Sequence, residues 1–268
     1  MQMFAKKKRK NCTFCLKYLH ISEKSSNFAG KIEFIMQELK HLVRNNWLFL
    51  SCFALTLIAM LVALFVMPKA DLHLVLNGYH TPFLDRFFFH YTHFCNWPMY
   101  VLMALPLLCR RPVWSFVFGA SEGLSAIVAH IVKACWSMPR PKVFFESLMD
   151  EHPALYDAWQ QTIVEGVNLH SWHSFPSGHT TAFFAFFAVL AFVYAEDRWP
   201  CNQLVGFVCF VLALLGGYSR IYLSQHFTLD VCVGMVIGVL TTVLVMFVFL
   251  RKNFNFSASR FGNIKKKQ

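Results

Sequence analysis

The chain has 268 residues, of which 56% are hydrophobic and 15% are charged, and its formal net charge is +11. Soluble domains carry about 25% charged residues, so this composition excludes an ordinary soluble globular protein. The basic residues lie mainly in the two tails, without interleaved aromatic residues on a folded face, which argues against nucleic-acid binding. The sequence instead predicts an all-α polytopic membrane protein.

Residues 1–46 are expected to form a basic cytoplasmic tail that ends in an amphipathic helix. The run KKKRK at 6–10 favours contact with anionic lipid head groups, and each such charge contributes on the order of 1 kcal/mol. In KIEFIMQELKHLVRNN, residues 31–46, apolar side chains recur at helical spacing opposite charged ones. This pattern predicts a helix on the membrane surface, and a short helix packed on cytoplasmic loops is the alternative.

Six apolar stretches follow, each near the roughly 20 residues that cross a bilayer as a helix. We therefore expect one six-span domain over residues 47–250 and a second basic cytoplasmic tail at 251–268. The spans are predicted at 47–67, from about Phe94 to residue 109, and at 112–132, 178–195, 203–219 and 231–250.

Two of these stretches contain features that concern packing. The sixth includes GMVIG at 234–238, a pair of small residues that favours close contact between helices. The fourth is rich in phenylalanine, and most of its rings are expected to face lipid, although some can line a groove for acyl or prenyl chains.

Nine cysteines are scattered along the chain, and most lie in or beside the apolar stretches. Cys12 and Cys15 form a lone CxxC pair, whereas a structural zinc site normally needs four ligands. No metal site is therefore predicted, and a solvated tail is expected at these residues.

Charge asymmetry predicts the orientation of the spans. With the N-terminus in the cytoplasm, the cytoplasmic tails and turns hold 19 of the 25 Lys and Arg residues, in agreement with the positive-inside rule. The connection 133–175 then lies outside, and its stretch at 146–166 allows a short helix. Three polar clusters end on this same outer side.

The first cluster flanks the end of the third span. Lys133 and Arg140 are seven residues apart, and Pro139 and Pro141 predict that the helix ends near Met138. Two cations at one helix end suit a phosphate group. For either residue alone, a side chain that marks the membrane boundary is the alternative.

The second cluster is PSGH at 176–179, where the fourth span begins. Ser177 is a candidate N-cap, and Gly178 lets an anion approach the free N–H groups of the first helical turn. His179 adds a proton donor beside that anion site. A capped helix with an interfacial histidine is the alternative.

The third cluster is SRIYLSQHFTLD at 219–230, between the fifth and sixth spans. His226 and Asp230 are four residues apart and share a face if the sixth helix begins nearby. A carboxylate beside an imidazole sets its tautomer and raises its basicity, which leaves the other nitrogen free to attack. A lone pair of this kind is often only a polar contact, but a second histidine and the cations, Arg220 included, favour catalysis.

The ordered pattern K-x6-RP, PSGH and SR-x5-H-x3-D resembles the signature of the type 2 phosphatidic acid phosphatase superfamily, which also includes vanadium haloperoxidases. The resemblance implies that His226 attacks phosphorus to form a phosphohistidine, that Asp230 orients it, and that His179 protonates the leaving oxygen and then activates water. It implies that no metal or other cofactor is required. It also implies that the phosphoryl oxygens are bound by Lys133, Arg140, Ser177, Gly178 and Arg220.

These features predict a membrane hydrolase acting on undecaprenyl diphosphate, phosphatidylglycerol phosphate, phosphatidic acid or lipid A phosphate. The predicted outer loops contain no N-x-S/T sequon, which fits a bacterial inner membrane with a periplasmic active site, while the terminal KKKQ leaves a eukaryotic endomembrane open. The oligomeric state is not determined by the sequence.

The alternative function is a transporter or channel. Glu122 interrupts the third span, and a charge inside a membrane often marks a transport pathway. His90, His93 and His130 would then extend a proton relay. Transporters usually bind near the bilayer midplane, however, whereas the three polar clusters gather at one rim.

Overall fold

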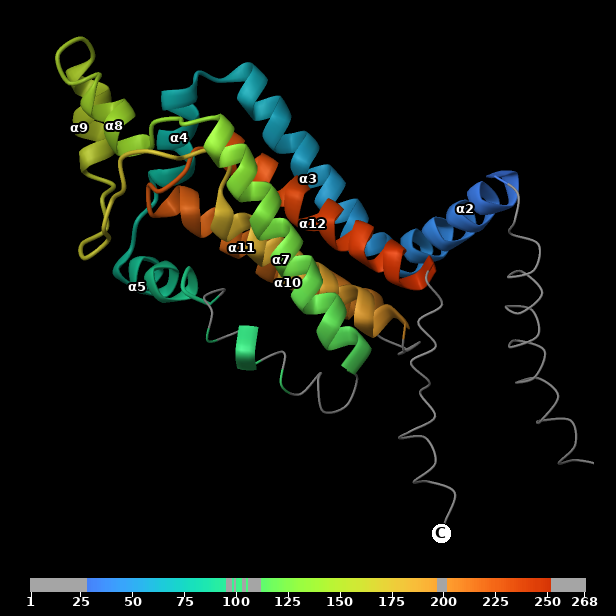
Figure 1. Ribbon diagram of the computed structural model, residues 1–268. Coiled ribbons are helices and arrows are strands. Elements are labelled where there is room, and N and C mark those ends of the chain that lie inside the picture. The colour runs from blue at the N-terminus through green and yellow to red at the C-terminus, as the bar shows by residue number, and fades with distance from the viewer. Residues whose placement is uncertain are drawn as a thin grey trace, which may run out of the picture. The chain divides into compact units, whose positions relative to one another are not determined.

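The computed structural model describes residues 28–94, 98, 100–102, 105, 112–196 and 202–251. Every regular element in these segments is a helix, so the predicted all-α class is confirmed for them (Figure 1). The helices are α2 (Phe28–Asn45), α3 (Trp47–Val66), α4 (Lys69–Asn77), α5 (Pro82–Tyr91), α7 (Pro112–Cys135), α8 (Pro141–Glu146), α9 (Pro153–Gln160), α10 (Gly178–Glu196), α11 (Asn202–Tyr222) and α12 (Thr228–Arg251).

Among the described residues, four helices are long and apolar enough to cross a membrane. Their candidate segments are Trp47–Val66 in α3, Trp114–Cys135 in α7, Gln203–Tyr222 in α11 and Thr228–Val248 in α12. A shorter apolar segment, Gly178–Val193, belongs to α10. The second predicted span lies largely outside the described residues, so the six-span count stays a prediction.

The chain divides into two units, and in the first the structure describes α2. The predicted amphipathic helix is present, and it begins at Phe28, three residues before the stretch that signalled it. Met36, Leu39 and Val43 follow helical spacing and are exposed. Contact of this apolar stripe with a membrane surface stays a prediction.

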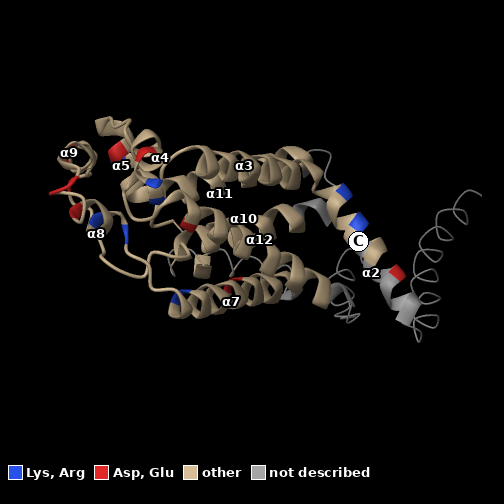
Figure 2. Ribbon diagram, turned by 90° about the horizontal axis from the view of Figure 1, so that it is seen from above, with Lys and Arg blue, Asp and Glu red and all other residues tan. Residues whose placement is uncertain are grey.

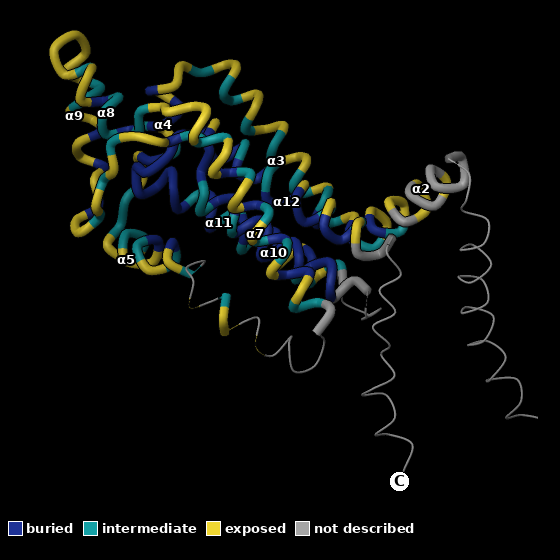
Figure 3. The backbone as a smooth tube through the Cα atoms, in the orientation of Figure 1, coloured by how far each residue is buried: buried dark blue, intermediate teal, exposed yellow. Residues whose placement is uncertain are grey.

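Residues 45–268 form the second unit, in which α10 lies at the centre. Helices α7, α11 and α12 all pack against α10, and α3 packs against α11 and α12. Figure 3 shows most of α10 as buried, in dark blue. The expectation that its phenylalanines mostly face lipid is therefore wrong, because Phe183, Phe184, Phe186 and Phe187 are all buried among neighbouring helices.

Helix α12 approaches the start of α10 closely because it carries glycine at two contact positions. A Cβ atom added at Gly234 would lie 2.7 Å from the carbonyl oxygen of Ser177, and one at Gly238 would lie 2.5 Å from that of Thr181. The close packing predicted from GMVIG is confirmed. It allows the backbone N–H of Ser177 to donate to the carbonyl oxygen of Asp230 at 3.0 Å, which joins two of the predicted clusters.

We expect Gly238→Ala to destabilise the protein by about 1–3 kcal/mol, because the added methyl group must push α12 away from α10. Gly119→Ala on α7 is the matched control, since its Cβ would meet nothing within 4 Å and alanine favours a helix. Thermal unfolding in detergent measures both variants. Equal midpoints for wild type and Gly238→Ala would contradict the close contact.

Candidate active site

The first cluster lies where α7 gives way to α8. Helix α7 ends at Cys135, three residues before the predicted end, so Lys133 lies in its last turn and Arg140 lies beyond it as the N-cap of α8. The Arg140 guanidinium donates from Nε to the carbonyl oxygen of Trp172 at 3.0 Å. Its Nη1 donates to Gln225, to the backbone oxygen at 3.2 Å and to Oε1 at 3.0 Å. These bonds hold the arginine against the turn that carries His226.

The second cluster forms the start of α10. Ser177 is the N-cap, because its Oγ accepts from the Thr180 N–H at 3.3 Å and from the Thr180 hydroxyl at 2.8 Å. Gly178 and His179 are the first two residues of the helix. The space beside the Gly178 Cα is open, since an added Cβ would meet no atom within 4 Å. An anion can therefore approach this end of the helix dipole.

The third cluster is a tight turn between α11 and α12. The backbone N–H groups of Gln225 and His226 donate to the carbonyl oxygen of Arg220, at 2.9 and 3.1 Å, so the turn folds back on the end of α11. His226 precedes α12, and Asp230 lies in its first turn. His226 Nδ1 is 3.5 Å from Asp230 Oδ2, which also accepts from the Phe227 N–H at 3.0 Å.

Burial determines the charge of His226, which is only 1% exposed. Loss of hydration, together with the positive charges of Arg140 and Arg220, lowers the pKa of His226 to about 3 against the opposing effect of Asp230. The imidazole is therefore neutral at neutral pH. With an Nδ1–H directed at Asp230, the lone pair lies on Nε2.

Arg140 and Arg220 act on His226, and Lys133 joins them in acting on the nearby loop residue His170. The pKa of His170, on the loop before α10, is lowered by desolvation and then by Arg140, Arg220 and Lys133, which shows that the three charges converge. His179 also lies within electrostatic reach of Arg220 and His226. In Figure 2 the long helices are mostly tan, and blue and red segments gather towards their ends. The eight predicted site residues lie at the end of α7, at the start of α8, at the start of α10, near the end of α11 and around the start of α12.

Arg220 is 7% exposed and only partly paired. Its Nη1 donates to the hydroxyl of Thr92, just beyond α5, while its Nε has no hydrogen-bond partner in the part of the chain that the structure describes. A buried donor without a partner costs about 1–3 kcal/mol, so an arriving phosphate oxygen would relieve that cost.

A cavity of about 270 Å³ adjoins these residues between α7 and α10. Its lining includes Lys133 and Gly178 at the cluster and, deeper along α7, His130 and Glu122. Glu122 is hydrogen-bonded to Tyr100, while its buried Oε1 has no partner among the described residues. Of the four residues considered for a proton relay, His90 and His93 do not line this cavity.

Several functional contacts involve residues that the sequence did not single out. The Ser174 hydroxyl donates to Asp230 Oδ2 and lies 3.5 Å from His226 Nδ1. Ser224 adopts a left-handed backbone with φ 52°, and its hydroxyl accepts from Trp159 Nε1 at 2.6 Å and lies 3.0 Å from His73 Nε2. These bonds fix the turn on both sides of the imidazole.

We expect Ser174→Ala to lower kcat about 10- to 150-fold, because a hydrogen bond to a charged group contributes about 1.5–3 kcal/mol and here orients the carboxylate beside His226. Ser147→Ala is the control, since that exposed hydroxyl donates only to the Phe144 carbonyl oxygen of its own helix. Wild-type turnover in Ser174→Ala would show that the hydroxyl does not position Asp230.

Comparison with known proteins identifies the family. The sequence profile of the PAP2 superfamily matches residues 114–254, which is more than half of the chain, and the chain belongs to this superfamily. The resemblance inferred from the three motifs is confirmed. Together with the apolar helices, it supports a multi-pass membrane protein of the lipid phosphatase kind.

Individual relatives are more distant. The chain is 27% identical to lipid A 4'-phosphatase of Porphyromonas gingivalis over 187 residues, which cover 68% of this chain and 73% of that protein. It is 34% identical to the bacitracin transport permease protein BcrC of Bacillus licheniformis over 82 residues, only 31% of this chain and 36% of that one. The crystal structure of Aquifex aeolicus LpxE matches with a TM-score of 0.52 at 25% identity, covering 66% of this chain and 94% of LpxE.

Proposed function

We propose that the protein hydrolyses a lipid phosphate or diphosphate at the membrane rim through a phosphohistidine on His226. The observation that carries this proposal is a neutral, buried imidazole that lies beside the Asp230 carboxylate and within electrostatic reach of the Arg140 and Arg220 guanidinium groups. A neutral imidazole is a nucleophile, and the cations stabilise charge that develops on the phosphoryl oxygens. The name of the Porphyromonas gingivalis relative supports a lipid phosphate as substrate.

In the first step, His226 Nε2 attacks phosphorus and the bond from phosphorus to the leaving oxygen breaks. The positive charge that develops on the imidazole is stabilised by Asp230, 3.5 Å from Nδ1. His179, at the start of α10, gives its proton to the leaving oxygen. Nitrogen thus replaces oxygen on phosphorus, and the lipid leaves as an alcohol or a phosphate.

In the second step, the deprotonated His179 takes a proton from a water molecule, which attacks the phosphohistidine and releases inorganic phosphate. The phosphoryl oxygens are bound throughout by basic side chains and by the cap of α10, namely Lys133, Arg140, Arg220, Ser177 and the Gly178 N–H. Fixed positive charge directed at developing negative charge supplies a large share of catalysis. We therefore propose a reaction that needs no metal ion.

We further propose that this site lies on the periplasmic side of a bacterial inner membrane, in a six-span domain over residues 47–250. The tails, residues 1–46 and 251–268, would then lie in the cytoplasm, where the basic run at 6–10 binds anionic head groups. A lipid phosphate keeps its chains in the bilayer and its phosphate at the rim. The helix ends that carry the site would meet the phosphate there.

Transport is the second candidate function, and two observations favour it. One is the name of the BcrC relative, and the other is Glu122, which lines the cavity between α7 and α10. Against it, the BcrC match covers only 31% of this chain. A detergent solution has no gradient, so catalysis and transport are separated by measuring phosphate release there.

We expect the purified protein in detergent to release phosphate from at least one of undecaprenyl diphosphate, phosphatidylglycerol phosphate, phosphatidic acid and lipid A phosphate, and to do so in EDTA. His226→Ala should abolish release because no nucleophile remains, while His152→Ala, at an exposed position before α9, should retain it. Circular dichroism confirms folding. Release by His226→Ala, or full loss in EDTA restored by a divalent ion, would refute the mechanism.

We expect Cys135, an exposed thiol at the end of α7, to react with a membrane-impermeant maleimide in intact bacterial cells. The measurement uses a variant that keeps Cys135 alone, with the other cysteines replaced by alanine. A variant that keeps Cys12 alone is the control and should react only after permeabilisation, because its tail is predicted to be cytoplasmic. The reverse pattern would invert the proposed topology.

A further inference from the structure

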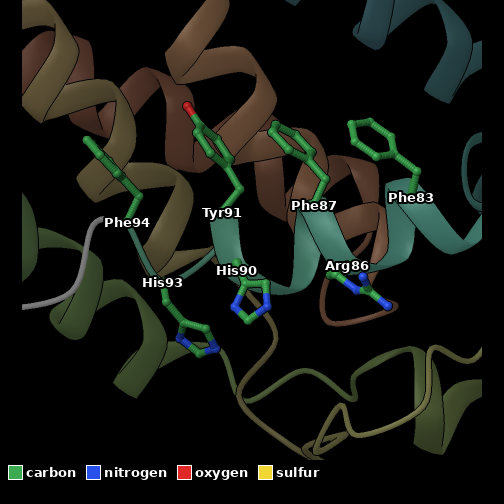
Figure 4. Close-up of a pocket in the computed structure, with 7 residues that line it drawn as sticks. All are labelled: Phe83, Arg86, Phe87, His90, Tyr91, His93 and Phe94. Carbon is green, nitrogen blue, oxygen red and sulfur yellow. The ribbon is translucent and has the colours of Figure 1, made fainter.

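Helix α5 and the turn after it carry a groove of about 550 Å³ that the proposed mechanism does not use. Figure 4 shows its lining as two rows of side chains that point to different sides of the helix. One row is aromatic and runs from Phe83 to Phe94, and the other is basic and consists of Arg86, His90 and His93. The surface of the groove is mainly apolar, and the basic row borders it on another side of the helix.

The basic row follows from the sequence spacing of α5. Arg86 and His90 lie at positions i and i+4 of α5, which places them on one face of the helix, and His93 follows in the turn after it. All three side chains are exposed. Arg86 is charged at every working pH, and the two histidines donate hydrogen bonds even when neutral.

The aromatic row forms a continuous stack. Phe83 and Phe87 have ring centroids 6.3 Å apart, Phe87 and Tyr91 5.3 Å, and Tyr91 and Phe94 6.0 Å, with interplanar angles of 16°, 12° and 14°. Phe83, at the far end, is 74% exposed. Such a wall suits a hydrocarbon chain, while the basic row suits an anion attached to it.

The end of α5 is directly connected to the candidate active site. Thr92 accepts a hydrogen bond from Arg220, one of the proposed phosphate-binding residues. The next residue, His93, lies within electrostatic reach of His179, the proposed donor to the leaving oxygen. The basic row therefore begins on the leaving-group side of the site and continues along α5 through His90 to Arg86.

Positive charge on the leaving-group side of the site indicates which class of substrate the site favours. A phosphate monoester leaves as a neutral alcohol, which needs no cation, whereas a lipid diphosphate leaves as an anionic lipid monophosphate. We propose, on the basis of the proposed function, that Arg86, His90 and His93 bind the second phosphoryl group of a lipid diphosphate. This makes a diphosphate, with its chain along the aromatic row, the preferred substrate class.

With a lipid diphosphate as the substrate, every bond that forms in the proposed reaction is matched by one that breaks. His226 Nε2 forms a bond to the terminal phosphorus, and the bond from that phosphorus to the bridging oxygen breaks. The bridging oxygen receives the proton of His179 and departs as part of the lipid monophosphate. The basic row stabilises the charge that this product carries.

The experiment compares kcat/KM for farnesyl diphosphate and farnesyl phosphate, which share one chain, in wild type, Arg86→Gln and Arg86→Glu. We expect the wild type to prefer the diphosphate, Arg86→Gln to lower the diphosphate-to-monophosphate ratio about tenfold, and Arg86→Glu to lower it further. Arg86 is exposed, so neither substitution disturbs a core. Lys40→Gln, the same loss of charge on α2, is the control and should keep the wild-type ratio.

The outcomes separate this inference from the function on which it rests. A wild type that prefers the monophosphate, or an unchanged ratio in both Arg86 variants, would overturn the diphosphate assignment and leave the phosphatase intact. Release of phosphate from neither farnesyl compound, nor from the four lipids tested above, would overturn the proposed function and this inference with it.

Discussion

The rest of the site depends on the hydrogen bonds that Asp230 accepts. Its Oδ2 accepts from the Ser174 hydroxyl and from the Phe227 N–H, and it faces His226 Nδ1. The backbone carbonyl of the same residue accepts from the Ser177 N–H, which fixes the start of α10. One residue therefore ties the loop before α10, the turn before α12 and α12 itself into a single geometry. Because the carboxylate is buried, each of these partners also offsets the cost of its desolvation.

This geometry is possible only because small residues line the contact between α10 and α12. The absence of side chains at Gly234 and Gly238 lets α12 reach the backbone of Ser177 and Thr181. Larger residues there would separate the PSGH turn from Asp230 and break the hydrogen bond from the Ser177 N–H to the Asp230 carbonyl oxygen. The apolar core and the polar site are thus parts of one arrangement, in which the packing of helices within the second unit determines the position of the proposed catalytic groups.

The sequence predicted contacts between residues that are close together in the chain, but not contacts between residues that are far apart in it. The cap at Ser177 and the pairing of His226 with Asp230 are local, so spacing alone located them. Ser174 is 56 residues from Asp230, and no feature of its own segment marks it, so only the fold could show the contact. The prediction that the phenylalanines of α10 face lipid was wrong for another reason. A helix buried among helices and a helix that faces lipid have the same apolar composition.

The charges of the site do not balance within the protein, and the imbalance has a chemical meaning. Lys133, Arg140 and Arg220 all act on His170, whereas the carboxylate of Asp230 acts on His226 and also on Lys69. The positive end of the α10 dipole adds to the excess. An excess of positive charge is costly unless an anion enters, and the phosphoryl group of the proposed substrate would supply that negative charge. Binding it would relieve repulsion that the folded protein already contains.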